Sequence, residues 1–398
     1  MNSPSGTQRE DAFSVVSTIL NGNKTGFELS EESHQKAIER FVVVSLRGSP
    51  RLMLPTAQPL MKRAIVNFLG NRRAAYLMPR LVQSAARIGG PFSSIVSEVS
   101  LTSDSNAPCP LRELIADTVG RDDFQIAMRL SLSRPNPKAV VMAISDAGET
   151  LCYAKIGTEA MTNELVAHES SILEQFSTSN MPLIVPRQIY AGTWADAHQI
   201  LITTPLQLTA LRRDASVAHQ AADALACQHL VTDTPLIDSE FWRNIIERTE
   251  EFNLDENDNI LTKVAKIEQT WGARSFDFGA SHGDWTRTNL GLIDGQVAAL
   301  DWERFSKSAP RGIDIAHFAI CENLVRPLGR AIEIDPVTVH VRQYLESADL
   351  ARENAEPLIT LALLEMVIRF KSAQKVGLRS KGSKFESALK TCLQYWTV

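Results

Sequence analysis

The chain has few cysteines, and their arrangement does not suit the common cysteine-based sites. None of the five forms a CxxC pair, and they lie far apart in a sequence of 398 residues: Cys109, Cys152, Cys227, Cys321 and Cys392. Such a set is a poor disulfide framework and a poor zinc site. Free thiols are typical of a reducing compartment, so we expect a cytoplasmic protein.

Long apolar runs are missing as well. No stretch of about 18 apolar residues occurs, so we expect no transmembrane helix. The first residues, MNSPSGTQREDAF, lack a basic stretch followed by an apolar one, so we predict no secretory signal. The formal net charge of −5 does not favour nucleic acid as a partner. With 44% hydrophobic residues, the chain should form a globular protein with two or three cores.

Acidic residues are absent from residues 51–97. This segment carries seven basic residues among apolar ones: Arg51, Lys62, Arg63, Arg72, Arg73, Arg80 and Arg87. A basic amphipathic segment can lie on an anionic membrane or bind an acidic partner, so peripheral membrane contact through residues 51–90 is one interpretation. The alternative is an ordinary helical subdomain with a solvated basic face, because any surface helix needs an apolar face.

Hydrophobic periodicity divides the chain into three parts. Residues 1–118 form an N-terminal extension, partly helical and basic, with a helix at Glu31–Arg40 and a strand at Phe41–Leu46. Residues 119–206 are rich in strands, predicted at Phe124–Leu132, Ala139–Ser145, Thr150–Ile156, Gln188–Tyr190 and Ile200–Thr204, with one helix at Thr162–Phe176. Residues 207–398 are mostly helical, including Pro357–Lys375 and Ser383–Tyr395. This order predicts an α+β protein with a small β-rich lobe, a larger helical lobe and a cleft between them.

Asp294-Gly295 is a signal for a two-residue hairpin turn inside the helical part. In the register that this turn sets, Ile293 faces Gln296. Asn289 then faces Leu300, which precedes Asp301, so an amide and a carboxylate come close together at one end of the hairpin.

Asp284 lies five residues before Asn289, in the loop that leads to this end of the hairpin. Amide and carboxylate oxygens suit a hard cation such as Mg²⁺. A separate carboxylate can orient a hydroxyl group and accept its proton, as in kinase-type phosphoryl transfer. The alternative is a solvated polar rim on the hairpin.

His282-Gly-Asp284, Asn289 and Leu300-Asp-Trp-Glu303 together resemble the catalytic segment of the aminoglycoside phosphotransferase and choline kinase family. The resemblance implies a protein-kinase-like two-lobed fold, here with an N-terminal extension. It implies that Asp284 is the catalytic base, that Asn289 and Asp301 bind Mg²⁺, and that His282 supports the loop.

Two further features follow from the same resemblance. Gly312-Ile-Asp314-Ile-Ala316 is similar to a family element in which the Asp bonds the catalytic loop from a helix N-terminus; a simple N-cap is the alternative. Arg287, inside the loop, could stabilise the transferring phosphoryl group or be an ordinary surface arginine. Glu303 could support the metal-binding segment or pair with Arg304.

A kinase of this kind also needs a lysine on a strand and a glutamate on the following helix. Lys155 ends such a strand. Of the three acids on the next helix, only Glu169 shares the apolar face marked by Leu165 and Ile172. A carboxylate on that face needs a partner because an unpaired buried charge is costly, so we predict that Glu169 holds Lys155.

The nucleotide-binding part departs from the protein-kinase pattern. The loop at residues 131–138 has no glycine, so Ser133, Arg134 or Lys138 could contact phosphate with side chains instead. By resemblance, Ile200–Thr204 is the hinge strand, and backbone groups near Thr203 to Leu206, including those of Thr204, would bind adenine.

The expected function is ATP- and Mg²⁺-dependent transfer of phosphate to a hydroxyl group of a small molecule or glycan precursor. Candidates for the acceptor pocket are Trp242, Trp271, Trp285, Glu322 and residues 233–240. The alternative is a kinase-like scaffold, a pseudokinase that docks to a membrane or an anionic polymer through residues 51–90. The complete set of candidate catalytic residues argues against lost catalysis.

Overall fold

The computed structural model describes residues 6–30, 37–46, 49–69, 95–105, 107–130, 138–211, 216–250, 260–325, 334–347, 350, 352–375 and 389. The chain divides into two compact units. The first comprises Met1–Ser170 and Arg187–Pro205, and the second comprises Ser171–Pro186 and Leu206–Val398. The boundaries predicted after residues 118 and 206 stay predictions.

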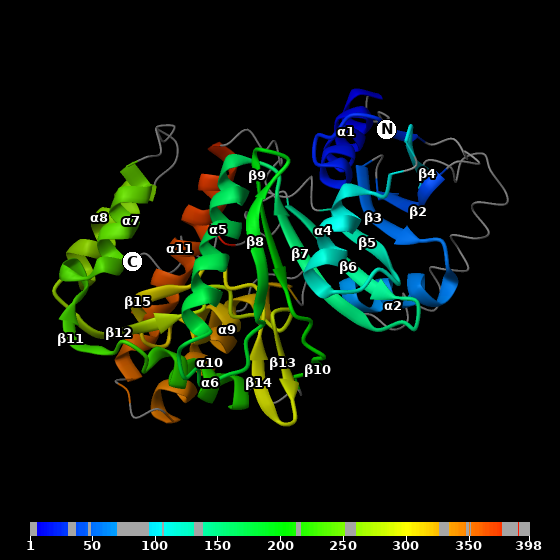
Figure 1. Cartoon of the computed structure of the whole chain (residues 1–398). Coiled ribbons are helices and arrows are strands. Elements are labelled where there is room, and N and C mark those ends of the chain that lie inside the picture. The colour runs from blue at the N-terminus through cyan, green and yellow to red at the C-terminus, as the bar shows by residue number, and fades with distance from the viewer. Residues whose placement is uncertain are drawn as a thin grey trace. The chain divides into compact units, whose positions relative to one another are not determined.

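A nine-stranded antiparallel sheet forms the centre of the first unit, in the order β1-β4-β2-β3-β5-β6-β7-β9-β8 (Figure 1). The strands are β1 (Phe27–Ser30), β2 (Ala37–Leu46), β3 (Ser49–Pro55), β4 (Val96–Ser103), β5 (Phe124–Leu130), β6 (Lys138–Ser145), β7 (Thr150–Gly157), β8 (Gln188–Trp194) and β9 (His198–Thr203). β3 pairs with β5 through Leu52 opposite Arg129 and Met53 opposite Met128. The strands of the N-terminal extension therefore continue the sheet formed by β5 to β9.

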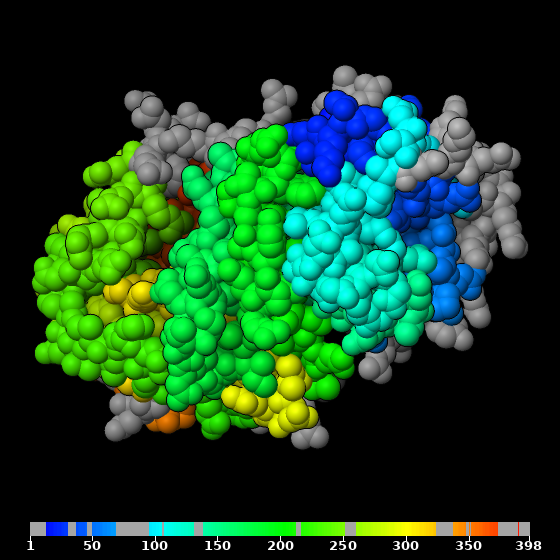
Figure 2. All heavy atoms as spheres, viewed as in Figure 1, coloured from blue at the N-terminus to red at the C-terminus, as the bar shows by residue number. Residues whose placement is uncertain are grey.

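Helices cover both faces of this sheet. α1 (Gly6–Asn21) and α4 (Pro110–Val119) pack on one face, and α1 adjoins α4 in Figure 2 as dark blue beside cyan. α2 (Gln58–Leu69) packs on the other face. Successive side chains of a strand point to opposite faces of the sheet. Phe41 and Val43 therefore pack in the apolar core on one face, and Val42 packs in the core on the other.

α2 uses its apolar face inside the protein. Leu60, Met61 and Ile65 are buried against the sheet, whereas Lys62 and Arg63 are exposed. This arrangement is the ordinary helix of the second interpretation of the basic segment. Arg72, Arg73, Arg80 and Arg87 lie outside the described residues, and membrane contact through 51–90 stays a prediction.

The helix predicted at Glu31–Arg40 is wrong for residues 37–40, the part of it that the structure describes. Ala37–Arg40, the end of the predicted helix, belong to β2 and pair with β4, with Arg40 opposite Ser100. Pairing with a strand distant in sequence overrides the local helical pattern. The strands predicted at Phe124–Leu132, Ala139–Ser145 and Thr150–Ile156 are confirmed as β5, β6 and β7, with small differences at their ends.

The second unit combines helices with two small antiparallel sheets. The helices are α6 (Ser216–Ala226), α7 (Glu240–Glu250), α8 (Ile260–Trp271), α9 (Ile313–Val325), α10 (Ile334–Ser347) and α11 (Ala355–Lys375), with 3₁₀ turns η2 (Leu236–Asp238) and η3 (Arg352–Asn354). One sheet contains β10 (Thr209–Ala210), β13 (Leu290–Ile293) and β14 (Gln296–Ala299), and the other contains β11 (Val231–Pro235), β12 (Ser275–Ser281) and β15 (Ser306–Pro310). The sequence predicted the β13–β14 hairpin but not the second sheet.

The α+β class is confirmed, with a β-rich N-terminal part and a helical C-terminal part. α5 (Ala160–Phe176) begins in the first unit, and its residues from Ser171 belong to the second. Among the residues that the structure describes, none of the helices combines the length and the apolar content needed to span a bilayer.

Candidate active site

The β13–β14 hairpin has the predicted register. Both residues of the Asp294-Gly295 turn have positive φ, 50° and 85°, as a type I′ turn requires. Ile293 pairs with Gln296, and the Leu300 N–H donates to the Asn289 carbonyl oxygen at 2.8 Å. The turn therefore positions the residues at the open end of the hairpin, as the sequence predicted.

The 281–289 loop, which leads into this hairpin, is anchored by a carboxylate on α9. Asp314 is 5% exposed and lies in the first turn of that helix. It accepts hydrogen bonds from the Ser281 hydroxyl (2.9 Å), the His282 N–H (2.8 Å) and the Gly283 N–H (3.0 Å). Three donors satisfy this buried charge and fix the start of the loop. Asp314 thus makes the loop contacts that the resemblance implied.

His282 joins the loop to the end of β14. Its ring is fully buried; Nε2 is 2.9 Å from the Leu300 carbonyl oxygen, and Nδ1 is 3.1 Å from the Asp284 nitrogen. These partners require a neutral imidazole, in which Nε2–H donates and Nδ1 accepts. Burial lowers the pKa of His282, which favours the same neutral form. The predicted supporting position of His282 is the observed one.

Gly283 fits where no other residue would. Its φ is +78°, and a Cβ atom there would lie 2.3 Å from the Arg304 carbonyl oxygen. Its own carbonyl accepts a hydrogen bond of 2.5 Å from Arg369 on α11, whose Nε also donates to Glu365 at 2.6 Å. The loop is therefore held from both sides. Sequence reasoning missed Arg369, because its contact with Gly283 joins residues 86 positions apart.

Asp284 and Asn289 are joined directly. The Asn289 amide nitrogen donates to the Asp284 carboxylate at 2.7 Å and to its backbone carbonyl at 3.0 Å. Both partners are acceptors, so the amide nitrogen must face Asp284 and the amide oxygen faces away. The Asp284 side chain is 39% exposed, and its other oxygen is 3.8 Å from His317 Nε2. Asp284 is therefore held in one orientation while its carboxylate stays open to a ligand.

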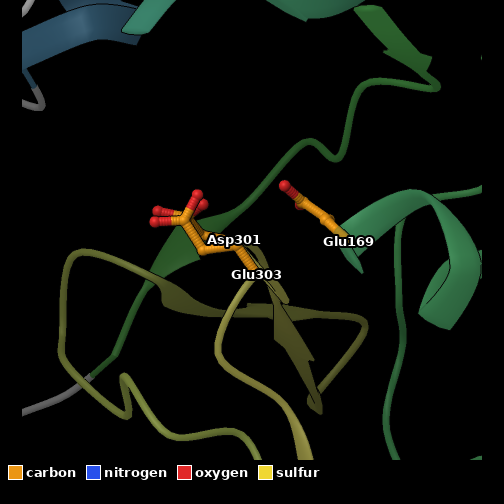
Figure 3. A group of neighbouring side chains, drawn as sticks. All are labelled: Glu169, Asp301 and Glu303. Carbon is orange, nitrogen blue, oxygen red and sulfur yellow. The ribbon is translucent and has the colours of Figure 1, made fainter. Parts of the chain in front are cut away.

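Asp301 and Glu303 offer two carboxylates next to the hairpin end. Their oxygens lie within 4.8 Å of each other, and Figure 3 shows both side chains pointing the same way from the segment after β14. Asp301 has φ +69°, a conformation that non-glycine residues seldom adopt and that is common at functional sites. Carboxylate oxygens are ligands that Mg²⁺ prefers, and the Asn289 amide oxygen would be a further ligand of the same kind. The metal roles of Asn289 and Asp301 stay predictions, and Glu303 becomes a third candidate.

Arg287 does not stand alone on the surface. Its Nε donates to Glu322 on α9 at 2.8 Å, and its guanidinium lies over the Phe318 ring at 5.3 Å. Its role in phosphoryl transfer stays a prediction. Two candidates for the acceptor pocket, Trp242 and Trp285, are buried in the core, at 1% and 0% exposed, and a part for them in that pocket stays a prediction.

Lys155 and Glu169 form the predicted pair within the first unit. Lys155 Nζ is 2.7 Å and 2.6 Å from the two carboxylate oxygens of Glu169, which projects from α5 (Figure 3). Glu169 is 1% exposed, whereas the other acids of this helix, Glu164 and Glu174, are exposed. The choice made from helical periodicity is therefore confirmed. Binding of nucleotide by Lys155 stays a prediction.

The structure gives less information about the other residues that were predicted to bind the nucleotide. Ser133 and Arg134 lie outside the described residues. Lys138 begins β6 opposite Gly157. Thr204 forms two hydrogen bonds with the backbone of Arg187. The Thr204 N–H donates to the Arg187 carbonyl at 2.8 Å, and the Thr204 hydroxyl accepts from the Arg187 N–H at 2.9 Å. Its position beside adenine stays a prediction.

No protein-family model and no curated protein matches this sequence. The fold is similar to that of several solved kinases at low identity. A thermostable mutant of aminoglycoside phosphotransferase APH(4)-Ia, in complex with ADP and hygromycin B, is 12% identical over 72% of this chain and 97% of that one, with a TM-score of 0.48. A putative fructosamine-3-kinase from Haemophilus somnus 129PT is 14% identical over 72% and 96%, with a TM-score of 0.44. A Plasmodium vivax ethanolamine kinase is 12% identical over 70% and 82%, also with a TM-score of 0.44.

Proposed function

We propose that this chain is an ATP-dependent phosphotransferase that phosphorylates a hydroxyl group. The observation that carries the proposal is the 281–289 loop with the segment that follows β14. There a partly exposed carboxylate, Asp284, is oriented by Asn289, and two further carboxylates, Asp301 and Glu303, come from the end of the same hairpin. One acid for the acceptor and an oxygen-rich set for a cation is the division of labour that phosphoryl transfer needs.

Each residue has a distinct role in this proposal. Asp284 accepts a hydrogen bond from the acceptor hydroxyl and takes its proton as the oxygen attacks the γ-phosphorus. The bond from the γ-phosphorus to the β,γ-bridging oxygen breaks, and ADP leaves. Lys155, held by Glu169, binds the nucleotide phosphates. Asn289 and Asp301 would hold Mg²⁺, which would supply positive charge beside the phosphates.

Arg287 already donates to Glu322 through Nε, one of its five N–H donors. Its guanidinium is engaged at 2.8 Å by that carboxylate, and both side chains are about one quarter exposed, at 25% and 22%. A negatively charged phosphoryl group would compete with Glu322 for the same cation. We therefore assign Arg287 to the reaction as a cation for which Glu322 and the transferring group compete.

Asp284 indicates that the acceptor carries a hydroxyl group. It does not indicate which class of hydroxyl compound binds. A small polyol, an amino sugar or a glycan precursor each offers one. Because Trp242 and Trp285 are core residues, an aromatic cage for a quaternary amine cannot use them. Trp271 is only partly buried, so the acceptors to test include hydroxyl-rich compounds and a quaternary amine that carries a hydroxyl group.

The test is nucleotide binding followed by turnover with the native chain. ATP with Mg²⁺ should raise the melting temperature, because a ligand that binds only the folded state stabilises it. ADP release should then be screened over polyols, amino sugars and glycan precursors. The matched control is Asp301→Ala, which should lose the Mg²⁺-dependent part of the shift. No stabilisation by nucleotide and no ADP from any acceptor would overturn the proposal, and full turnover in Asp301→Ala would overturn the metal assignment.

A further inference from the structure

Two histidines on different helices of the second unit form a pair near the charges of Arg287 and Glu322. His219 lies on α6 and His340 on α10, and their Nε2 atoms are 3.0 Å apart. The ring centroids are 4.7 Å apart, and the ring planes are inclined by 78°. In Figure 1 the two helices lie together with α9 in the same part of the second unit. Nothing in the proposed phosphoryl transfer uses this pair.

The separation of the rings is short for a linear hydrogen bond between them. A ring centroid lies about 1.2 Å behind its nitrogen, so two rings facing end-on across 3.0 Å would have centroids about 5.4 Å apart. The observed 4.7 Å means that the rings are tilted away from the N–N line. Two nitrogens at about 2.05 Å from one shared ion, and 3.0 Å from each other, would subtend about 95° and place their centroids about 4.7 Å apart. The pair therefore has the spacing of two imidazoles that share one metal ion.

A second layer of contacts fixes the two helices in register. Asp223 lies one helical turn after His219, and Tyr344 lies one turn after His340. The Tyr344 hydroxyl donates to Asp223 at 2.8 Å, and Arg311 holds the same carboxylate with bonds of 2.8 Å and 3.0 Å. The histidines are thus presented by rigid elements, as a preorganised site requires.

Packing also limits the movement of the histidine rings. Phe318 on α9 contacts both, with its centroid 5.8 Å from His219 and 6.3 Å from His340. Both histidines are only partly buried, so an ion and its water ligands could reach them. Burial lowers the pKa of His340, which favours the neutral imidazole that a metal needs.

We propose that His219 and His340 form a binding site for a first-row transition-metal ion, such as Zn²⁺, Ni²⁺ or Cu²⁺, with water completing the coordination. Imidazole nitrogen suits these ions, whereas Mg²⁺ prefers oxygen. The site is thus chemically distinct from the oxygen set of Asn289 and Asp301. Its ligands are not residues assigned to the reaction, and it is a separate proposal even though His340 lies near the charges of Glu322 and Arg287.

The test is metal binding by the full chain in excess Mg²⁺. Calorimetric titration with Ni²⁺ should reveal one site that Mg²⁺ does not displace, and electron paramagnetic resonance of one equivalent of Cu²⁺ should show coupling to two nitrogens. His219→Gln and His340→Gln should each weaken Ni²⁺ binding at least about tenfold. The control is His229→Asn, which changes an exposed histidine at positive φ and keeps a residue that tolerates this backbone; it should bind Ni²⁺ like the native chain.

The outcomes separate the metal site from a plain hydrogen bond between the rings. Unchanged Ni²⁺ affinity in both glutamine variants, or no binding by the native chain at about 1 mM Ni²⁺, would overturn the site. If either variant fails to fold by circular dichroism, the Cu²⁺ spectrum of the native chain decides alone: two-nitrogen coupling supports the site and its absence overturns it. Loss of metal binding with intact ADP formation would separate this proposal from the phosphotransferase.

Discussion

The 281–289 loop and the Lys155–Glu169 pair are held in place in different ways. The loop is fixed by partners from other parts of the second unit: Asp314 binds its first residues, and Arg369 binds the Gly283 carbonyl. The pair is an ion pair between neighbouring elements, β7 and α5, only 14 positions apart. The position of the loop therefore depends on contacts with several residues, whereas the position of the pair depends on its two side chains.

This difference has consequences for substitutions. A substitution at Asp314 or Arg369 removes only some of the hydrogen bonds that hold the loop. We therefore expect it to lower stability and activity only in part. A change in the pair leaves a buried charge without this partner, so we expect a steep effect. The chemistry itself should respond differently again, because Asp284 is the residue that we propose to act on the substrate.

The largest effect is expected from Asp284→Asn. Asparagine can still accept the bond from the Asn289 amide through its oxygen, so the loop should keep its shape. It cannot take a proton, so the rate of phosphate transfer should fall by about 10²–10⁴-fold. ADP formation measures the rate, and the melting-temperature shift with ATP and Mg²⁺ should stay as in the native chain. Turnover at the native rate would remove Asp284 as the base.

Lys155→Met should have the next largest effect and would sharpen the contrast with the loop. It leaves the buried Glu169 carboxylate without its lysine, which should lower the free energy of unfolding by about 3–5 kcal/mol. The stabilisation by ATP and Mg²⁺ should be lost as well. Chemical denaturation measures the first quantity, and thermal shift measures the second.

The double variant Lys155→Met/Glu169→Leu is the control for that experiment. It removes both charges, so much of the lost stability should return, since a buried ion pair is often replaceable by apolar residues. Nucleotide binding should not return. A double variant that binds ATP like the native chain would contradict the role of Lys155.

How far the sequence predicts this site depends on how local each contact is. The hairpin register follows from two adjacent turn residues, Asp294 and Gly295, and helical periodicity alone separates Glu169 from its neighbours. Arg369 could not be found in this way, because a glutamate and an arginine four positions apart are common on helices and the Gly283 contact depends on the packing of α11.

The fold shows the same limit. β5, β6 and β7 are consecutive strands joined by short connections, and their pattern is visible in the sequence. Ala37–Arg40 have a helical pattern but become part of β2 through pairing with β4, whose residues lie about 60 positions later. β12 and β15 are likewise strands only because each completes a sheet with distant segments.

Asp314 tests whether the loop anchors act by degrees. Asp314→Ala leaves the Ser281 hydroxyl and the His282 and Gly283 N–H groups without their acceptor, so the free energy of unfolding should fall by about 3 kcal/mol. Asp314→Asn keeps one oxygen, which already accepts two of these bonds in the native chain, so its loss should be smaller. Urea denaturation of both variants measures this. Equal losses in the two variants would mean that the individual hydrogen bonds do not contribute separately to the free energy of unfolding.

The smallest effect concerns pH and again arises from the loop. Burial lowers the pKa of His282, so below its ordinary value of about 6.5 the unfolded chain binds a proton that the folded chain excludes. The free energy of unfolding should therefore fall as the pH drops below about 6.5, by at most about 1.4 kcal/mol per pH unit for this histidine. Denaturation between pH 7 and pH 5.5 measures the slope.

His340 contributes with the same sign, because burial lowers its pKa too. The variant His340→Gln removes that contribution. Burial lowers the pKa of His317 but Cys321 and Asp284 raise it, to about 9, so His317 contributes with the opposite sign above about pH 6. The slope that remains below pH 6 can be compared with the one expected from His282. Nitrogen chemical shifts provide the direct measurement: in the folded chain, Nε2 of His282 should carry the proton and Nδ1 should not, since Nδ1 accepts the Asp284 N–H. A doubly protonated ring in the folded chain at pH 6 would mean that this bond does not hold the loop as the structure describes.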